Sequence, residues 1–369
     1  MRIAVDATPL AGRTTTGVGR YILALLAGLA ARPEGRDTLV VLADPAAQQR
    51  LPRGHPFRLH LLRVHDWLGP LARETARQND LRALCRAEGI DVLHATLDPV
   101  WPMRDTRQVV TVHDVARASR ASRGLRVGSP RERLRTVIRY GLARRADCIL
   151  TVSEFSRAEI GRVLRVDPAR IAAVHTAIEE PFRRAIDPAQ ARRVLADLGV
   201  APGYVLFVGE FGRQKNEAGL MAAWTTLRGE GYAAGLVLVG DGPLAICQED
   251  GIRVLRGVGD EGLAHLYAGA ACLCLPSFYE GFGLPVVEAM AAGAPVVVSA
   301  GSALSEVAGE AGIAVDPADP ASIARGLRTA LDAGQAPDWR ARSRERAAHF
   351  TADRMTDGVL VAYREALRP

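Results

Sequence analysis

Short apolar runs alternate with longer helix-like segments along the whole 369-residue chain. Most of these runs are continuously apolar, as in strands that are buried on both faces of a parallel sheet. The runs expected to form strands are Arg2–Val5, Leu39–Leu42, Val92–His94, Val109–Val112, Cys148–Val152, Ile171–Val174, Tyr204–Val208, Leu236–Val239, Cys272–Leu275 and Pro295–Val298. Alternating strands and helices indicate βαβ units. The sequence therefore predicts an α/β fold of doubly wound parallel sheets, whose ligands bind at the carboxyl ends of the strands.

The strand–helix pattern is interrupted near Glu179–Pro202, where a proline-containing stretch and one helix precede a fresh strand. With about 150 residues per domain, the length suits two domains. We therefore predict two similar α/β halves, residues 1–183 and 184–350, with a cleft between them. The remaining segment, 351–369, has a helical pattern. It is either the last helix of the second half or a helix that crosses back onto the first.

Charge and cysteine content narrow the class of protein. The net charge is +6 and the pI about 9.3, a mild excess that suits anionic ligands or membrane surfaces. No arginine run is interleaved with aromatic residues, which argues against nucleic acid. The five cysteines show no metal-ligand spacing, and the alternating Cys272 and Cys274 are expected to be buried in a strand. We expect a soluble protein of the reducing cytosol, because no signal peptide or membrane span is recognisable. The other three cysteines are Cys85, Cys148 and Cys247.

Among 47 basic residues the chain has a single lysine, Lys215. It follows the Tyr204–Val208 run in the loop GEFGRQKN, together with Arg213. A planar guanidinium and a compact ammonium together suit a diphosphate group. The alternative is a solvated loop that happens to carry two cations.

The stretch Pro276–Ser299 places two carboxylates, Glu280 and Glu288, within apolar surroundings. Burying an ionised carboxylate without a partner is costly, so packing alone does not explain them. Pro285 suits the first turn of a helix, which puts Glu280 on a loop and Glu288 one turn into that helix. A hydroxyl-rich ligand that also carries a phosphate would explain both acids. An acid–base pair of a glycosidase is an alternative reading.

The loop before this helix is expected to present backbone N–H groups near the positive end of the helix dipole, where an anion is stabilised. The residues that would supply these groups are Gly281, Phe282, Gly283 and Leu284. A metal site is not expected here, because no histidine or aspartate joins the two glutamates.

Two further candidates lie in the first half. Gly17 and Gly19 open an apolar helix after the first strand, where the backbone can approach an anion closely. His113 follows the Val109–Val112 run, at the ligand-binding edge of the predicted sheet. Each also has a structural explanation, as a turn before a helix or as a cap on a strand. His94 is a weaker candidate of the same kind.

These motifs, taken in order, resemble those of the family 4 retaining glycosyltransferases (GT4), which have the GT-B fold of two Rossmann-like domains. Glu280 and Glu288 match the family's E-x7-E signature. The other matching segments are GVGRY, VVTVHDV, ILTVSEFSRAEI, YVLFVG, LVLVGDGPL and SALSEVAGEAGIAVDPAD. They cover nearly the whole chain.

The resemblance implies transfer of a hexose from a nucleotide-diphosphate sugar to a hydroxyl acceptor, with retention of the anomeric configuration. Glu288 would hold the ribose and Glu280 the hexose, and Arg213 and Lys215 would neutralise the diphosphate. The amides of residues 281–284 would meet the sugar and the β-phosphate, Gly17 and Gly19 would close on the phosphates, and His113 would lie beside the anomeric carbon. No metal or other cofactor is implied, and the last helix would cross back to the first half.

The general likeness is to bacterial cell-surface mannosyltransferases, which makes mannose and GDP-mannose the first expectation. The chain departs from the family at Glu210, where arginine or threonine is common, and in the spacing of FGRQKN. These departures leave two possibilities open. Either Arg213 contacts phosphate together with Lys215, or Lys215 alone does.

The segment Arg117–Arg145 has ten arginines and one acid, Glu132. In this family the first half binds the acceptor, which is often lipid-linked, so a basic face there would suit an anionic membrane. A solvated arginine-rich helix is the alternative. For the whole chain, the other readings are a sugar-nucleotide epimerase or a phosphorylase of the same fold, and a non-catalytic sugar-nucleotide-binding protein.

Overall fold

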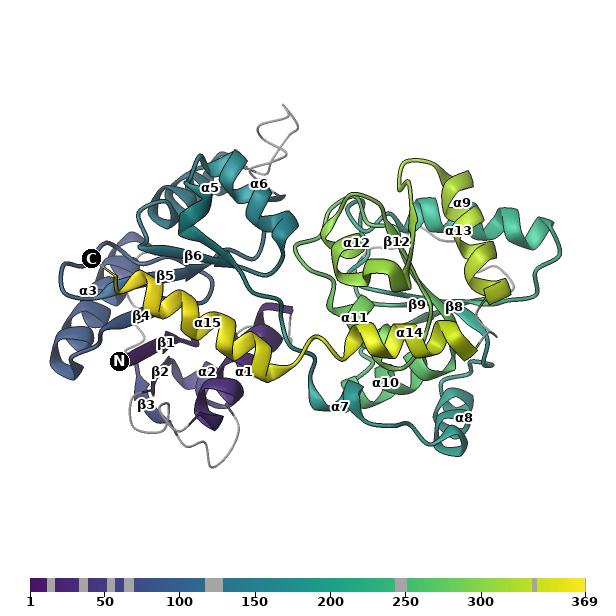
Figure 1. Cartoon of the computed structure of the whole chain (residues 1–369), viewed down its shortest axis with the longest axis horizontal. Helices are drawn as coiled ribbons and strands as arrows, with labels where there is room; N and C mark the ends of the chain where they lie inside the picture. Colours follow the sequence, from purple (N-terminus) through teal and green to yellow (C-terminus); the bar gives the residue numbers. More distant parts are fainter. Residues whose placement is uncertain are drawn as a thin grey trace. The chain divides into compact units, whose positions relative to one another are not determined.

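The computed structural model describes residues 1–11, 17–32, 39–51, 57–62, 70–116, 129–242, 251–333 and 337–368. The chain divides into two compact units, Met1–Ala177 with Thr351–Pro369 (unit 1) and Ile178–Phe350 (unit 2) (Figure 1). The division comes before the boundary at 183/184 that the sequence suggested. The reason is local, since the Phe182 ring packs on Tyr267 of unit 2 with 6.0 Å between ring centroids.

Unit 1 alternates strands and helices, and the last helix of the chain completes it. Its elements are β1 (Ile3–Asp6), η1 (Thr8–Ala11), α1 (Gly17–Ala31), β2 (Leu39–Ala43), α2 (Pro45–Gln48), β3 (Arg58–Leu61), α3 (Pro70–Glu88), β4 (Val92–Ala95), β5 (Arg107–Thr111), α5 (Pro130–Ala143), β6 (Cys148–Thr151), α6 (Glu154–Leu164), η3 (Pro168–Arg170), β7 (Ile171–Ala173) and α15 (Ala352–Ala366).

Unit 2 repeats the same alternation. Its elements are α7 (Glu180–Arg183), α8 (Pro188–Asp197), β8 (Tyr204–Val208), α9 (Glu217–Gly229), β9 (Leu236–Val239), β10 (Ile252–Leu255), α10 (Asp260–Gly269), β11 (Ala270–Leu275), α11 (Leu284–Ala291), β12 (Val296–Ser299), α12 (Ala303–Ala308), η4 (Gly309–Ala311), β13 (Gly312–Val315), α13 (Pro320–Ala333) and α14 (Pro337–Ala347).

Each unit contains one parallel sheet. The strand order is β3-β2-β1-β4-β5-β6-β7 in unit 1 and β10-β9-β8-β11-β12-β13 in unit 2. The pairings are in parallel register, for example Val5 opposite His94 and Leu206 opposite Val237. Both orders are the doubly wound arrangement, in which the chain direction across the sheet reverses beside the first strand. The predicted fold class is therefore confirmed.

Three strands were not predicted, and all three lie at sheet edges: β3, β10 and β13. An edge strand has a neighbour on one side only and need not be apolar on both faces. The residues of β3, for instance, are exposed or half-buried throughout. Continuous hydrophobicity therefore identified the central strands and the edge strand β7, and it missed these three edge strands.

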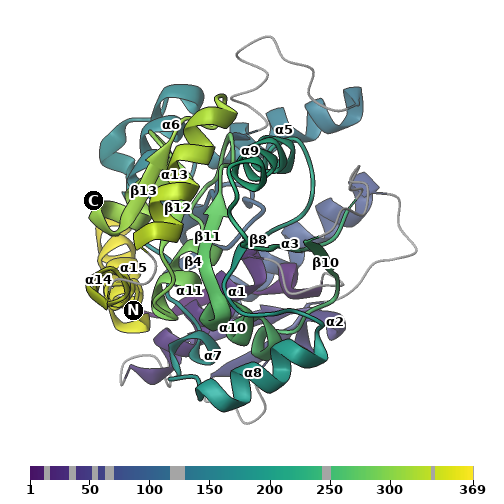
Figure 2. The same ribbon diagram turned by 90° about the vertical axis from the view of Figure 1, so that its right-hand side faces the viewer.

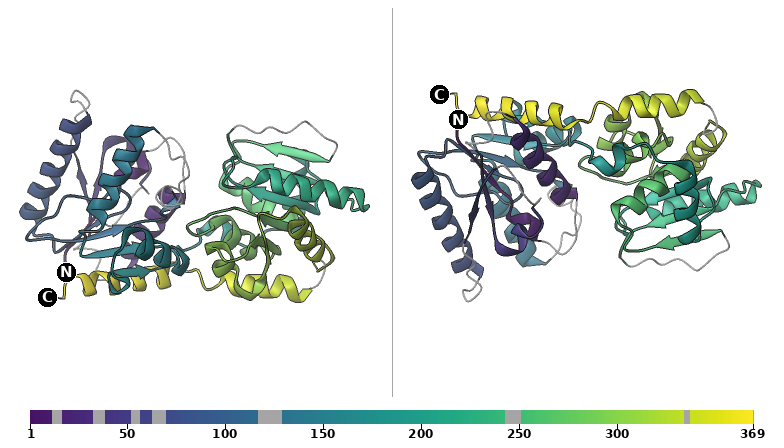
Figure 3. Two further views of the ribbon diagram at one scale, coloured as in Figure 1. Left: turned by 90° about the horizontal axis from the view of Figure 1, so that it is seen from above. Right: turned by 90° about the horizontal axis from the view of Figure 1, so that it is seen from below.

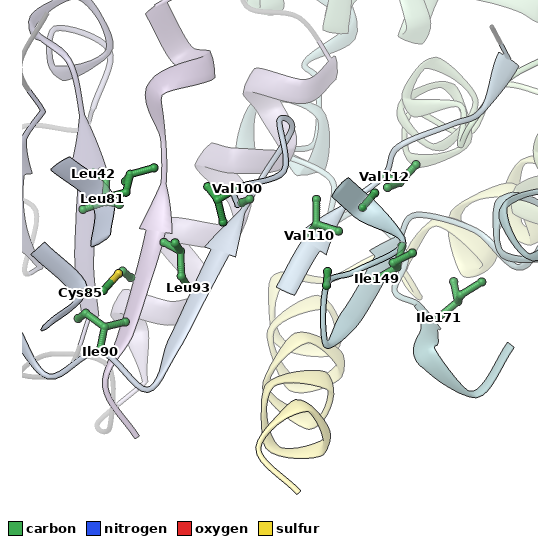
Figure 4. Packing of buried hydrophobic residues seen from close by; sticks show 14 of the residues in the cluster. Leu42, Leu81, Cys85, Ile90, Leu93, Val100, Val110, Val112, Ile149 and Ile171 are labelled. Atoms are coloured by element: carbon green, nitrogen blue, oxygen red, sulfur yellow. The ribbon is translucent and has the colours of Figure 1, made fainter. Parts of the chain in front are cut away.

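The core on one face of the unit 1 sheet is aliphatic. Figure 4 shows alternate strand residues such as Leu93, Val110 and Ile149 packed together with Leu81 and Cys85 of α3. Of the five cysteines, Cys85, Cys148, Cys272 and Cys274 are buried and free. The burial predicted for Cys272 and Cys274 is therefore confirmed, whereas Cys247 lies outside the described residues.

The opposite face of the unit 1 sheet is covered by α1 and α15, which lie side by side (Figures 1 and 3). A buried polar chain ties these helices to the strands. Nδ1 of His94 is 2.6 Å from the Tyr363 hydroxyl, and its Nε2 is 2.7 Å from Oγ1 of Thr111. The Tyr21 hydroxyl lies 3.0 Å from the same Thr111 oxygen. His94 is thus a structural residue that anchors the last helix to the sheet.

In unit 2, helices cover both faces of the sheet. Figure 2 shows α9 and α13 together on one side of β8, β11 and β12, and α8 and α10 together on the other. Among the described residues, no helix is both long enough and apolar enough to span a bilayer.

Candidate active site

The loops after β8 and β11 form the ligand-binding edge of unit 2. These two strands are neighbours in the sheet, with β9 on the far side of β8 and β12 on the far side of β11. The strand order therefore reverses between them, and the loops at their carboxyl ends leave the sheet in different directions. In open α/β sheets such a switch point is where ligands bind. The loops are residues 209–216 and 276–283, which carry most of the predicted site.

Asn216 and Gln214 fix the first loop against the second. Asn216 adopts the left-handed conformation (φ 58°) and caps α9, while its Nδ2 donates to the carbonyl oxygens of Pro276 at 3.0 Å and Pro317 at 2.7 Å. Asparagine tolerates this backbone region better than most residues, and its short amide reaches both carbonyls. Gln214 donates to the carbonyl of Tyr279 at 3.0 Å. The lysine between them is therefore held on a rigid base.

Lys215 and Glu280, predicted separately to contact a ligand, meet each other. Nζ of Lys215 lies 2.6 Å from Oε1 of Glu280, and the two side chains are 23% and 13% exposed. The lysine stem also passes over Gly209, where an added Cβ would lie 3.4 Å from its Cε. A half-buried ion pair with its remaining polar atoms open to a ligand can hold hydroxyls through the acid and an anion through the ammonium.

Glu288 is almost fully buried, at 2% exposure, on the first turns of α11. Its Oε2 accepts a hydrogen bond of 2.8 Å from the hydroxyl of Tyr267, a residue of α10. A buried carboxylate is tolerated when hydrogen bonds stabilise it. Tyr267 thus holds the carboxylate in one orientation.

The N-terminus of α11 is a favourable place for an anion. Pro285 lies in the first turn, as predicted, and no side chain caps the helix. Gly283 precedes it with φ 115°, a conformation that favours glycine, and an added Cβ would overlap Leu304. Phe282 packs away from the loop on Phe350, with 5.7 Å between ring centroids. The contribution to ligand binding that we predict for residues 281–284 therefore comes from their backbone N–H groups, and the phenyl ring of Phe282 takes no part in it.

Arg213 lies on the same loop as Lys215 and is exposed. Its side chain makes no hydrogen bond or ion pair with any other residue of the described ranges. The structure does not bring it into the Lys215–Glu280 pair.

The unit 1 candidates gather at the carboxyl edge of its sheet. Gly17 is the first residue of α1, and Gly19 is buried in its first turn. Tyr21, one turn later, packs edge-on against the His113 ring with 4.9 Å between centroids. Sequence reasoning placed these residues on separate motifs, and the fold brings them to one end of the unit.

His113 is held as a neutral imidazole. Its Nε2 lies 3.0 Å from the carbonyl oxygen of Thr96, so this nitrogen carries the proton and donates it. Burial lowers the pKa of His113 to about 4. Burial also lowers the pKa of His94, to about 3. At neutral pH His113 therefore offers a ligand its Nδ1 lone pair and no positive charge.

These two histidines make a prediction about stability. Between pH 6.5 and about 4 the unfolded chain binds protons at both positions and the folded chain does not. The free energy of unfolding should therefore fall as pH falls through this range, by up to about 1.4 kcal/mol per pH unit for each histidine. Urea unfolding midpoints at a series of pH values measure this slope. The His113→Gln variant should show a shallower slope, and an unchanged slope would contradict a buried neutral His113.

Comparison with known proteins decides the family. The family described as Glycosyltransferase Family 4 matches residues 15–180, and the one described as Glycosyl transferases group 1 matches residues 202–333. The O-antigen chain mannosyltransferase B of Escherichia coli is 35% identical over 281 residues, 71% of each chain. This chain is a family 4 glycosyltransferase.

Solved structures agree with the fold of this glycosyltransferase. The sucrose-phosphate synthase of Thermosynechococcus elongatus superposes with a TM-score of 0.74 at 21% identity, covering 99% of this chain and 98% of that one. Anabaena HepE in complex with UDP-glucose gives 0.73 at 17% identity, covering 98% of both chains. At these identities the likeness concerns the fold, which is GT-B.

Three residues that organise this glycosyltransferase site were missed in the sequence: Tyr267, Asn216 and Gln214. Tyr267 lies 21 residues before Glu288 on another helix, and nothing in its neighbourhood sets it apart from a core tyrosine. Asn216 did carry a signal, because asparagine directly before a helix is a typical N-cap.

Proposed function

We propose that this glycosyltransferase transfers a hexose, with mannose as the first candidate, from a nucleotide-diphosphate sugar to a hydroxyl acceptor and retains the anomeric configuration. The observation that carries the proposal is the Lys215–Glu280 pair at 2.6 Å, set beside the uncapped N-terminus of α11. One place thus offers an acid for sugar hydroxyls and positive charge for a diphosphate. Support for mannose comes from the E. coli mannosyltransferase relative. Support for a nucleotide sugar comes from the HepE complex with UDP-glucose.

The proposed roles follow the positions of the residues. Glu288, whose carboxylate Tyr267 orients, binds the ribose hydroxyls, and Glu280 binds the hexose. Lys215 and Arg213 face the diphosphate, and the backbone amides of 281–284 meet the sugar and the β-phosphate. Gly17 and Gly19 of unit 1 approach the phosphates, and His113 accepts a hydrogen bond from the hexose near the anomeric carbon. Because Lys215, Arg213 and the α11 N-terminus supply positive charge, we propose that transfer needs no divalent metal.

The setting of the reaction is part of the same proposal. We place this enzyme in the cytoplasm, in synthesis of a cell-surface polysaccharide or glycolipid. We also propose that the segment Arg117–Arg145 contacts the inner face of the membrane. Residues 117–128 of that segment lie outside the described residues.

The donor is tested by thermal unfolding with a panel of nucleotide sugars, among them GDP-mannose and UDP-glucose, with and without EDTA. A donor at 100 times its Kd stabilises the folded state by about 2.7 kcal/mol, a rise in Tm of several degrees. We expect the largest rise with GDP-mannose, unchanged by EDTA. The anomer of the product is then assigned by NMR. A larger rise with another nucleotide sugar, an inverted product, or conversion of the donor without any acceptor would each contradict the corresponding part of the proposal.

A further inference from the structure

A small pocket lies at the edge of the unit 1 sheet that is opposite to the candidate site. It has a volume of about 220 Å³, with Arg82 and Arg86 of α3 on one side and residues 102–106 on the other (Figure 1 labels α3 and β5). Arg107, the next residue, begins β5, so the pocket is at the amino ends of the strands. His113 follows the carboxyl end of the same strand, about 20 Å away at about 3.3 Å per residue. We call this cavity the amino-edge pocket.

The lining of the amino-edge pocket is cationic. It contains the arginines Arg82, Arg86 and Arg104 and a single acid, Asp105, which gives a net charge of +2. The acid is 3.9 Å from Nε of Arg86, and the two side chains are 74% and 75% exposed. An ion pair this long and this exposed contributes little. Arg104 is exposed and has no hydrogen bond or ion pair within the part of the chain that the structure describes.

Other arginines at the same edge do have carboxylate partners. Arg2 precedes β1, and Arg58 and Arg107 begin β3 and β5. Arg2 and Arg58 both bind Glu88, at 2.6 and 2.8 Å. Arg107 binds Asp147 at 2.9 Å. These two acids are therefore already paired, and the arginines of the amino-edge pocket keep a positive potential that a bound anion would neutralise.

The pocket is also prepared to receive a particular kind of anion. Arg82 donates through Nη2 to the carbonyl of Pro102 at 3.2 Å, and its guanidinium lies 5.6 Å from the centre of the Trp101 ring. These contacts hold the side chain in place before any ligand arrives. Arg86 lies one turn later on the same face of α3. Guanidinium groups bind phosphate oxygens through paired hydrogen bonds, which favours phosphate over a simple halide.

The size of the pocket limits the ligand. A volume of about 220 Å³ is below the roughly 300–1,000 Å³ of a site for a drug-sized molecule. A nucleotide sugar is therefore too large for it. Pro102 and Met103 add an apolar surface on which a short carbon skeleton can lie.

We propose that the amino-edge pocket binds a small molecule with a phosphate group, separately from the nucleotide-sugar site. Arg82, Arg86 and Arg104 surround the phosphate, and the carbon part of the ligand contacts Pro102 and Met103. Because the pocket is at the opposite edge of the sheet from His113, its ligand is not a reactant and acts on the enzyme through the chain.

The loop between β4 and β5 connects the pocket with His113. At one end of this loop the carbonyl of Thr96 accepts the hydrogen bond from Nε2 of His113, at 3.0 Å. Near the other end, the Trp101 amide donates to Gln78 at 2.9 Å, and the Trp101 carbonyl accepts from Gln108 at 2.7 Å. A ligand that fastens the end of the loop should therefore steady Thr96 and the imidazole that it holds. This effect rests on the proposed glycosyl transfer, whereas binding in the pocket does not.

Isothermal titration calorimetry at constant ionic strength tests the binding. Phosphate would also enter the proposed donor site, so the titrated chain carries Lys215→Ala and Arg213→Gln. We expect glycerol 3-phosphate and inorganic phosphate to bind this chain at one site and glycerol not to bind. Tighter binding of glycerol 3-phosphate would show that the carbon part is recognised, and equal affinities would identify free phosphate as the ligand. Adding Arg82→Gln and Arg104→Gln should weaken binding at least about tenfold.

Matched variants separate the pocket from general charge. Asp105→Asn removes the only acid of the lining and the partner of Arg86, so it should bind glycerol 3-phosphate more tightly. Arg192→Gln/Arg193→Gln removes two exposed arginines of α8 and should leave the affinity unaltered. Arg104→Gln alone removes a side chain without a protein partner, so weaker binding by this variant does not depend on a change in folding. Thermal unfolding without ligand checks each variant.

The proposal is overturned if the Lys215→Ala/Arg213→Gln chain binds neither phosphate compound. Equal binding after the loss of Arg82 and Arg104, or weaker binding by Asp105→Asn, would also overturn it.

The effect on His113 is measured as kcat at a saturating nucleotide sugar, which excludes competition at the donor site. Glycerol 3-phosphate should raise kcat of the native chain by about fivefold, the lower end of ordinary coupling between sites. The Arg82→Gln/Arg104→Gln variant should show no such rise. An unchanged or lower kcat in the native chain would contradict the coupling through the loop between β4 and β5.

Discussion

Replacing Glu288 by glutamine is expected to lower kcat/KM for the nucleotide sugar by about 100-fold or more, while the fold is retained. The amide oxygen of glutamine can still accept the hydrogen bond from Tyr267, which is 2.8 Å from Oε2 in the native chain. The charge is lost, and an NH2 group faces hydroxyls that need an acceptor. Two hydrogen bonds to a charged group, at about 1.5–3 kcal/mol each, account for a loss of this size. Steady-state kinetics and thermal unfolding of the same preparation measure both effects.

The glutamine variant is a sharper test than alanine. Glu288→Ala would leave the buried Tyr267 hydroxyl without this partner and lower stability by about 1–3 kcal/mol, so lost activity would have two explanations. Glu310→Gln, an exposed change in unit 2, is the control for charge alone and should leave activity unaltered. Near-normal turnover in Glu288→Gln would remove Glu288 from the proposed donor site.

Replacing Lys215 by alanine is expected to lower kcat/KM by about 1,000-fold. The change removes the ammonium proposed to face the diphosphate, and it leaves Glu280, 13% exposed, without its partner at 2.6 Å. An uncompensated half-buried carboxylate would then repel a phosphate that the native pair attracts. The folded structure should survive, because the loop is held by Asn216 and Gln214 and not by the lysine.

The composition of the chain allows a second, independent measurement. Lys215 is the only lysine, so an amine-reactive reagent has two targets, its Nζ and the α-amino group. Peptide mass spectrometry after labelling should show that GDP-mannose protects Lys215 and not the N-terminus. Arg193→Ala, an exposed cation lost from α8, is the kinetic control. Full labelling of Lys215 under a saturating donor, or unimpaired turnover in Lys215→Ala, would contradict the assignment.

Prediction from sequence succeeded for the central strands and for the edge strand β7, and it failed for the other three edge strands, β3, β10 and β13. The run Tyr204–Val208 coincides with β8 because every residue in it is buried on one face or the other. β10 was missed because Arg253 and Val254 are exposed at the edge of the sheet. A run of apolar residues indicates side chains that are buried. An edge strand forms through backbone hydrogen bonds to one neighbour, and fewer of its side chains need to be apolar.

The candidate site, like the fold, could be predicted only in part from the sequence. The E-x7-E spacing and the singular lysine identified Glu280, Glu288 and Lys215 as polar groups that packing does not explain. That Lys215 bonds to Glu280, 65 residues later, follows only from β8 lying beside β11. The exposure of Leu134, Val137 and Ile138 on α5 could not be predicted from the sequence either. A leucine, a valine and an isoleucine in a helix are expected to be buried.

By itself the sequence determined the α/β class, the family, the positions of the site loops and the chemistry each loop can offer. Local sequence patterns were enough for these features. Buried strands, helix starts and unusual polar residues can each be recognised from a few neighbouring residues. The tertiary structure decided which groups meet: the lysine with the first glutamate, Tyr267 with the second, and the last helix with His94. It also decided that Leu134, Val137 and Ile138 of α5 are exposed. Contacts between distant segments depend on strand order and on what covers each face, and neither is encoded in any short stretch of the chain.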